Sequence, residues 1–182
     1  MEKLITAAIL ASSVTLSAQE TRHEVVHSSG NPAQDTKPNS DEVPDVYALS
    51  GHLQRIVVLR FKFGTDLLAG LNKMVKQEKI KNAVILSGVG SVTNFQVHQV
   101  GNRDFPPKDV FVKNSNAPAD ILSMSGVVVA GRVHSHITLS NADKAFGGHL
   151  EPDTTVFTFA IVTLGVLDDD LDLSRVDDWN HR

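Results

Sequence analysis

The chain has 182 residues, of which 41% are hydrophobic, and these values suit one globular domain with additional segments. The formal net charge is -4 and there is no long basic run. This argues against a strong electrostatic footprint for nucleic acid and against a polybasic membrane patch. Because the chain contains no cysteine, it has no disulfide framework, no thiolate metal site and no cysteine nucleophile.

Residues 1–18 have the pattern of a secretory signal peptide. A short charged start is followed by an apolar run from Leu4 to Leu16, and polarity returns just after the small residue Ala18. The apolar run is too short for a comfortable transmembrane helix. An amphipathic or buried N-terminal helix is the alternative. We expect a periplasmic or secreted protein without stable membrane insertion after signal cleavage; without a functional signal it would be cytoplasmic.

Residues 19–45 differ in composition from the rest of the chain. Apolar residues are few there, and prolines interrupt a sequence rich in Ser, Asn, Asp and Gln. Such a segment buries too little apolar surface to offset its ordering entropy. We predict a flexible polar linker in which His23 and His27 are solvated, followed by a folded domain over residues 46–182.

The predicted domain contains several strands and one main helix. The β-branched apolar run 55–61 predicts a buried strand. After it, apolar residues from Leu67 to Val75 recur at helical spacing, and Thr65 can cap this helix, with Asp66 suiting its positive end. Further strands are expected at 83–86, 92–100, 109–113 (a short edge strand), 121–129, 131–139 and 154–167 (a central strand). This order of elements indicates an α+β fold.

Two polar or glycine-rich stretches are assigned structural roles. Gly88 and Gly90 resemble a phosphate loop only superficially, because neither a helix nor a Lys-Ser/Thr pair follows them. They predict a bulge or a sharp strand bend. The acidic end, residues 168–179, lacks the spacing of a calcium loop and is expected to be a solvated tail strand.

Three histidines near residue 140 carry the only concentrated chemistry. His134 and His136 are two apart in a strand-like run, so their imidazoles should project from the same face. Gly147 and Gly148 are expected to let the chain fold tightly before His149. Three imidazoles are good zinc ligands and leave one coordination position open, as in catalytic sites. The alternative is that these histidines pack in the fold or bond backbone carbonyls.

Other polar residues give weaker indications of a reaction. Glu151, two residues past His149, is the nearest candidate for a general base, although it could be an ordinary surface carboxylate. Asp143 and Asp104 are weaker candidates. Arg132 could hold an anionic ligand, but an ion pair with an acidic neighbour is the favoured interpretation. The sequence leaves open whether the protein is an enzyme.

An ordered set of motifs resembles the plant-and-prokaryote conserved (PPC) domain, over about residues 46–180. The motifs that carry the resemblance are Ile121–Gly126, Val133–Ser140, Gly147–Leu150, Tyr47–Arg60 as first strand, Gly64–Leu67 as helix start, Ser87–Val92 as a Gly-x-Gly-Ser turn, and Leu173–Arg175 as closing segment.

The resemblance implies a compact, mostly antiparallel sheet with one main helix, assembled into homotrimers. It also implies that His134, His136 and His149 converge on zinc or another divalent transition metal. Plant members attach the domain to AT-hooks that grip the DNA minor groove, but this chain has no Arg-Gly-Arg-Pro element. Residues 117–122 lack the Arg and Phe of the segment that plant members use for partner contacts.

Three functions remain open on the sequence. The first is an exported trimeric domain that binds a metal and a small-molecule ligand. The second is a DNA-binding or regulatory protein, the label that prokaryotic relatives commonly carry. The third is a structural interaction module whose histidines are packing residues. We favour the first, because the net charge of -4 and the export signal weigh against a nucleic-acid partner.

Overall fold

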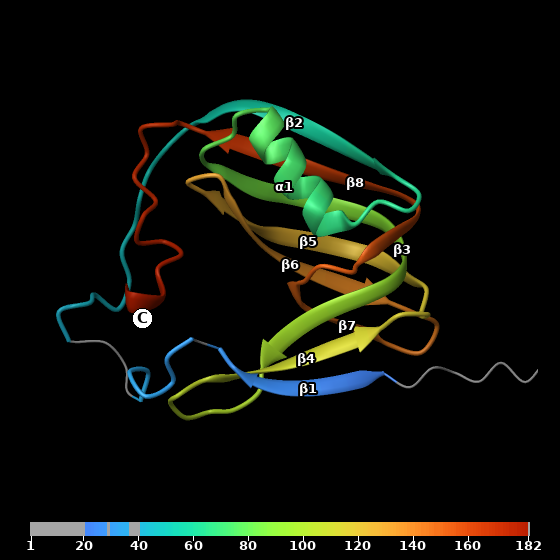
Figure 1. Cartoon of the computed structure of the whole chain (residues 1–182). Helices are drawn as coiled ribbons and strands as arrows, with labels where there is room; N and C mark the ends of the chain where they lie inside the picture. The colour runs from blue at the N-terminus through green and yellow to red at the C-terminus, as the bar shows by residue number, and fades with distance from the viewer. Residues whose placement is uncertain (1–20, 29, 37–40, 182) are drawn as a thin grey trace, which may run out of the picture.

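The computed structural model describes residues 21–28, 30–36 and 41–181 (Figure 1), so the expected signal peptide lies outside the described residues. The elements are β1 (Arg22–His27), β2 (Leu53–Lys62), α1 (Leu67–Gln77), β3 (Ala83–Val100), β4 (Lys108–Asn114), β5 (Ala119–Val129), β6 (Arg132–Ser140), β7 (Ala145–Leu150), β8 (Thr155–Leu167) and the 3-10 helix η1 (Trp179–His181). None of the described helices is long and apolar enough to cross a membrane.

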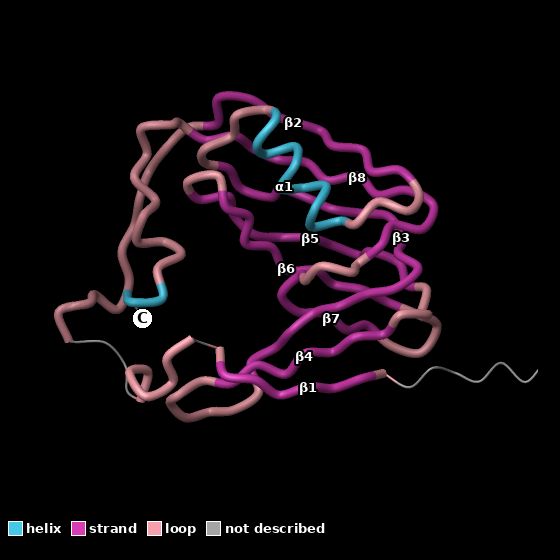
Figure 2. Tube along the Cα trace, in the orientation of Figure 1, coloured by secondary structure: helices cyan, strands magenta, loops and turns pink. Residues whose placement is uncertain are grey.

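The sheet is organised around β3, which is 18 residues long. The first half of β3 pairs with β5 and β8, and its second half pairs with β4 and β7. Because β5 also pairs with β6, and β6 with β7, strands β3, β5, β6 and β7 form a closed ring. All pairs are antiparallel, which confirms the expected α+β fold with a mostly antiparallel sheet and one main helix (Figure 2).

Helix α1 is positioned by its apolar stripe. Leu67, Leu71 and Val75 are buried at i, i+4 and i+8, and the helix packs against β2 and β6. The N-cap is Asp66 rather than the expected Thr65: its Oδ1 accepts a hydrogen bond of 2.8 Å from the amide of Ala69. The carboxylate satisfies an orphan N–H and also complements the positive end of the helix dipole.

The strands expected at 83–86 and 92–100 are parts of the single strand β3. The register with β8 shifts between Ile85 and Ser87 and again between Gly90 and Val92, so the predicted irregularity at the glycines is confirmed. Gly90 has a φ of 147°, which L side chains rarely adopt. The bulges bend β3, and this bend lets one strand take part in both halves of the sheet.

The expected linker contains a strand that composition did not reveal. β1 pairs along its whole length with β4, so β4, expected at the sheet edge, is an inner strand. Backbone hydrogen bonds hold β1, whose side chains are mostly exposed, and hydrophobic pattern does not report such bonds. β8, expected to be central, lies between β2 and β3. The boundary at residue 46 stays a prediction.

The acidic C-terminal segment is not the solvated strand that was expected. Leu173 is buried, and the Asn82 side-chain amide donates to the carbonyl of Leu171. Trp179 Nε1 donates a hydrogen bond of 3.0 Å to Asp35 Oδ1. The segment after β8 therefore runs along the body of the molecule to η1 (Figure 1). Its acidic residues are held near the molecule by these contacts.

A candidate metal centre built on neighbouring strands

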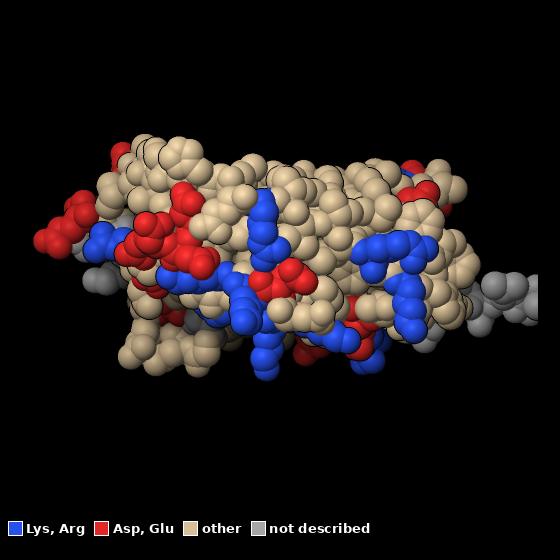
Figure 3. Space-filling view, turned by 90° about the horizontal axis from the view of Figure 1, so that it is seen from above, with Lys and Arg blue, Asp and Glu red and all other residues tan. Residues whose placement is uncertain are grey.

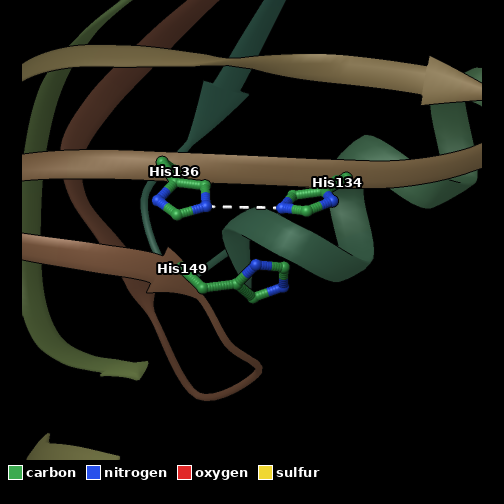
Figure 4. A group of neighbouring side chains, drawn as sticks. All are labelled: His134, His136 and His149. Carbon is green, nitrogen blue, oxygen red and sulfur yellow. Dashed lines mark hydrogen bonds between the residues drawn. The ribbon is translucent and has the colours of Figure 1, made fainter. Parts of the chain in front are cut away.

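Strand register brings the predicted histidines together. His136 on β6 is directly opposite His149 on β7, and His134, two residues before His136, shares its face of β6. Figure 4 shows the three imidazoles pointing toward one another. Their ligand atoms lie within 4.8 Å of one another. The predicted proximity is therefore confirmed, whereas their role as metal ligands stays a prediction.

The spacing of two of these rings suits a tetrahedral ion. His134 Nε2 and His136 Nε2 are 3.3 Å apart (Figure 4). Two nitrogens bound to one tetrahedral zinc at 2.0–2.1 Å would be about 3.3–3.4 Å apart. Without a metal, one of the two nitrogens carries a proton and donates a hydrogen bond to the other. A metal at this position would displace that proton.

His134 is held by a carboxylate from the C-terminal segment. Its Nδ1 is 2.7 Å from Asp177 Oδ1, and only 26% of the Asp177 side chain is exposed. Because an ionised carboxylate only accepts hydrogen bonds, Nδ1 carries the proton and Nε2 presents its lone pair. Metal-binding histidines usually make this second contact. The donor set thus fits a divalent transition metal.

The electrostatics of the site favour neutral imidazoles. The pKa of His149 is lowered to about 4, first by burial and then by His98, His134 and His136, while Asp177 acts in the opposite direction. Burial, followed by His134 and His98, also lowers the pKa of His136. Neutral imidazole is the form that binds a metal, so these shifts favour the binding form of His136 and His149.

The two glycines before His149 have a different role from the one expected. They lie inside β7, and the turn before it is closed by the hydrogen bond of 3.1 Å from the Asn141 amide to the Lys144 carbonyl. A Cβ on Gly147 would overlap the carbonyl oxygen of Ile137 on β6, and one on Gly148 would overlap that of His98 on β3. The two glycines therefore allow β6, β7 and β3 to approach closely. They do not form the tight turn that was expected.

His98 on β3 is a site residue that sequence reasoning missed. It is directly opposite His149 in the pairing of β3 with β7, and the two rings stack with centroids 4.5 Å apart. Its Nδ1 is 2.6 Å from Glu151 Oε1. Because His98 reaches His149 and Glu151 only through the long-range pairing of β3 with β7, local spacing did not reveal His98. Glu151, the suggested general base, thus lies beside the site in contact with His98.

Other candidates from the sequence are not brought to this point. Among the described residues, neither group of converging ligand atoms includes Asp104, Asp143 or Arg132. All three are exposed. His23 and His27 lie on β1 and are likewise outside both groups.

Residues 48–168 match the family model of the Plants and Prokaryotes Conserved (PCC) domain. The chain belongs to this family. A plant- and prokaryote-conserved protein from Pyrococcus horikoshii has the PCC fold with a TM-score of 0.56 and 24% identity, over 68% of this chain and 85% of that one. A protein from Archaeoglobus fulgidus described as metal-containing matches with a TM-score of 0.56 and 23% identity, over 69% of this chain and 89% of that one.

Two further proteins resemble this chain, one in its fold and one in its sequence. A protein from Bacteroides thetaiotaomicron, provisionally named a DNA-binding protein, matches with a TM-score of 0.52 and 18% identity over 65% of this chain and 83% of that one. At these identities the likeness concerns the PCC fold. The bifunctional protein GlmU of a Synechococcus strain is 28% identical over 114 residues, which are 60% of this chain but 16% of GlmU. The chain thus spans about a sixth of that relative.

Proposed function

We propose that this PCC domain binds zinc or another divalent transition metal through His134, His136 and His149. The observation that carries the proposal is the convergence of three imidazoles on one face of β6 and β7, with Asp177 bonded to His134. The fold that the chain shares with the metal-containing protein from Archaeoglobus fulgidus supports it.

The chemistry of the site follows from its donor set. A zinc ion with three histidine ligands keeps one position open and lowers the pKa of water there to about 7. Asp177 holds the proton on Nδ1 of His134 and so directs Nε2 into the site. Burial keeps His149 neutral. The open position would admit one donor atom of a small-molecule ligand.

We include a homotrimer in the proposal, and an exposed apolar face supports it. Ile56 and Val58 on β2 are 52% and 64% exposed, and Phe157 and Phe159 on β8 are 46% and 40% exposed. The pairing of β2 with β8 sets these side chains on one face. Seen from above, charged side chains gather on one side of the molecule and leave the other largely uncharged (Figure 3). Arg60 and Lys62 are exposed on the same face, and the apolar side chains beside them are of the kind that mark an interface.

Metal analysis of protein purified without a histidine tag tests the metal site. We expect His136→Ala to lose one equivalent of zinc per chain that the wild type retains after dialysis. His52→Ala is the matched control, because that side chain is 94% exposed and belongs to neither group of converging ligand atoms. The proposal fails if the wild type holds no stoichiometric metal, or if His134→Ala and His136→Ala bind as tightly as the wild type.

DNA binding is the second candidate function, favoured by the provisional name of the Bacteroides thetaiotaomicron protein. A net charge of -4 and the interspersed positive and negative side chains in Figure 3 weigh against it. Gel-shift titrations at two salt concentrations distinguish the candidates. Tight binding that weakens steeply with salt would favour DNA, whereas the metal-binding proposal expects weak binding at physiological salt.

Export to the periplasm or medium also belongs to the proposal, and it rests on the signal-like composition of residues 1–18. Cell fractionation and N-terminal sequencing of the mature protein test it. We expect a mature chain that begins at Gln19. Recovery of the full-length chain from the cytoplasm would contradict export.

A further inference from the structure

A second group of ligand atoms lies beside the three histidines. His98, His149 and Glu151 offer atoms within 4.8 Å of one another. His98 lies on β3, His149 lies on β7, and Glu151 directly follows β7. The amide of Glu151 donates a hydrogen bond of 3.1 Å to the carbonyl of Gln96, which fixes its position. The group thus continues the row of His136 and His149 across the sheet by one more strand.

A second carboxylate approaches the same histidine from β4. Phe111 is opposite His98 in the pairing of β3 with β4, and Asp109, two residues away, shares the face of Phe111. Asp109 Oδ2 is 3.9 Å from His98 Nε2, while Glu151 Oε1 is 2.6 Å from His98 Nδ1. His98 is therefore flanked by a carboxylate near each of its ring nitrogens.

The charges of this group do not balance. The side chains of Asp109 and Glu151 are only 14% and 19% exposed. Within the described part of the chain, no Lys or Arg forms an ion pair with either carboxylate, and His98 is the partner of both. Two largely buried carboxylates with one imidazole between them carry excess negative charge, which a cation would offset.

We propose that His98, Glu151 and His149 bind a second divalent cation, with Asp109 as a further carboxylate beside it. Mixed imidazole and carboxylate ligands suit zinc, manganese or ferrous iron. His149 lies between the two groups and has two ring nitrogens, one of which carries a proton in the neutral ring; to serve both ions it would release that proton and bridge them as an imidazolate. The His98 ring is stacked on His149, so it would have to turn out of this stack for both imidazoles to bind one ion.

This inference rests on the proposed function only through His149, which both sites use. Variants that affect one site alone therefore separate the two claims. His136 belongs only to the first group, and His98 and Glu151 belong only to the second.

Zinc titration by calorimetry, with metal analysis after dialysis, measures the number of bound ions per chain in the full-length untagged protein. We expect two equivalents for the wild type and one each for Glu151→Gln, His98→Ala and His136→Ala. The double variant His98→Ala/His136→Ala should retain none. Because even second-shell changes cost about 10–100-fold in affinity, removal of either ligand should weaken one equivalent by more than about tenfold.

Two matched variants control for the chemical changes. Glu24→Gln removes an exposed carboxylate on β1, and His52→Ala removes an exposed imidazole. Both should keep two equivalents. Circular dichroism of each metal-free variant checks that it is folded, and His98→Ala serves if Glu151→Gln does not fold.

The outcomes separate the two sites. A single equivalent that His136→Ala removes and Glu151→Gln leaves intact would overturn the second site while sparing the proposed function. A single equivalent that needs Glu151 and His98 but not His136 would support the second site and overturn the three-histidine site. Two equivalents that neither Glu151→Gln nor His98→Ala alters would also overturn the inference.

Discussion

Asp177 accepts a hydrogen bond of 2.7 Å from Nδ1 of His134, a residue 43 positions earlier in the chain. The C-terminal segment that carries Asp177 is fixed beyond it by the hydrogen bond from Trp179 Nε1 to Asp35 Oδ1. An acidic tail thus reaches back to orient a histidine on β6. The carboxylate fixes which ring nitrogen of His134 faces the other two imidazoles.

Replacement of this carboxylate should weaken metal binding without unfolding the protein. We expect Asp177→Asn to lower zinc affinity about 10–100-fold, because a neutral amide is a weaker acceptor and no longer fixes the tautomer of His134. Competition with a chromophoric chelator measures the affinity. The control is Asp178→Asn, which changes the adjacent carboxylate, a side chain that caps the amide of Asn180. Equal affinities for the two variants would contradict a role for Asp177.

The metal-free protein should lose stability as the pH falls from about 7 to about 4. The pKa of His149 is about 4 in the folded state against an ordinary value of 6.5, so between these values the unfolded chain binds more protons. Because the ring is partly exposed, solvent screening limits the loss to about 1–2 kcal/mol. Below pH 4 this contribution no longer changes.

Urea unfolding in the presence of a chelator, at pH 7 and pH 5, measures this dependence. His149→Asn removes the titrating ring and should reduce the difference between the two pH values. The lowered pKa of His136 acts in the same direction, so a smaller dependence should persist in that variant. An identical pH profile for wild type and His149→Asn would show that His149 does not contribute.

A methyl group at Gly148 should separate β7 from β3. The Cβ would overlap the carbonyl oxygen of His98, so the strands must move apart. We expect Gly148→Ala to cost about 1–3 kcal/mol in the free energy of unfolding and to displace His149. Chemical denaturation and zinc titration measure the two effects. Gly30→Ala is the control, since an added Cβ there meets no atom within 4 Å, and it should match the wild type in both.

A charge on the exposed apolar face should dissociate the proposed trimer. Val58→Glu introduces a carboxylate on β2 at a position that is 64% exposed in the single chain. Burial of that charge in an interface would be costly, so monomers should dominate in light scattering after size exclusion. The comparison is Val25→Glu on β1, 61% exposed on a different strand. If both variants elute as trimers, this face is not the interface.

Elements with a local pattern of apolar side chains could be predicted from the sequence, and elements held only by pairing with a distant strand could not. Strands β5, β6 and β8 have local apolar patterns, and helix α1 has an apolar stripe, so their positions follow from side-chain periodicity. β1 has no such pattern, and backbone pairing with β4 holds it in place. Its position depends on a strand more than 80 residues away, which local composition does not encode.

The sequence by itself determined the α+β class and the shared face of His134 and His136, because both depend on local periodicity. It also placed His149 in the same group through the resemblance to a known domain. Only the tertiary structure added His98 and Asp177 and showed that Glu151 contacts His98, since strand register and the path of the C-terminal segment bring these residues to the site. Contacts between residues distant in sequence depend on how the sheet closes, and local spacing carries no information about that closure.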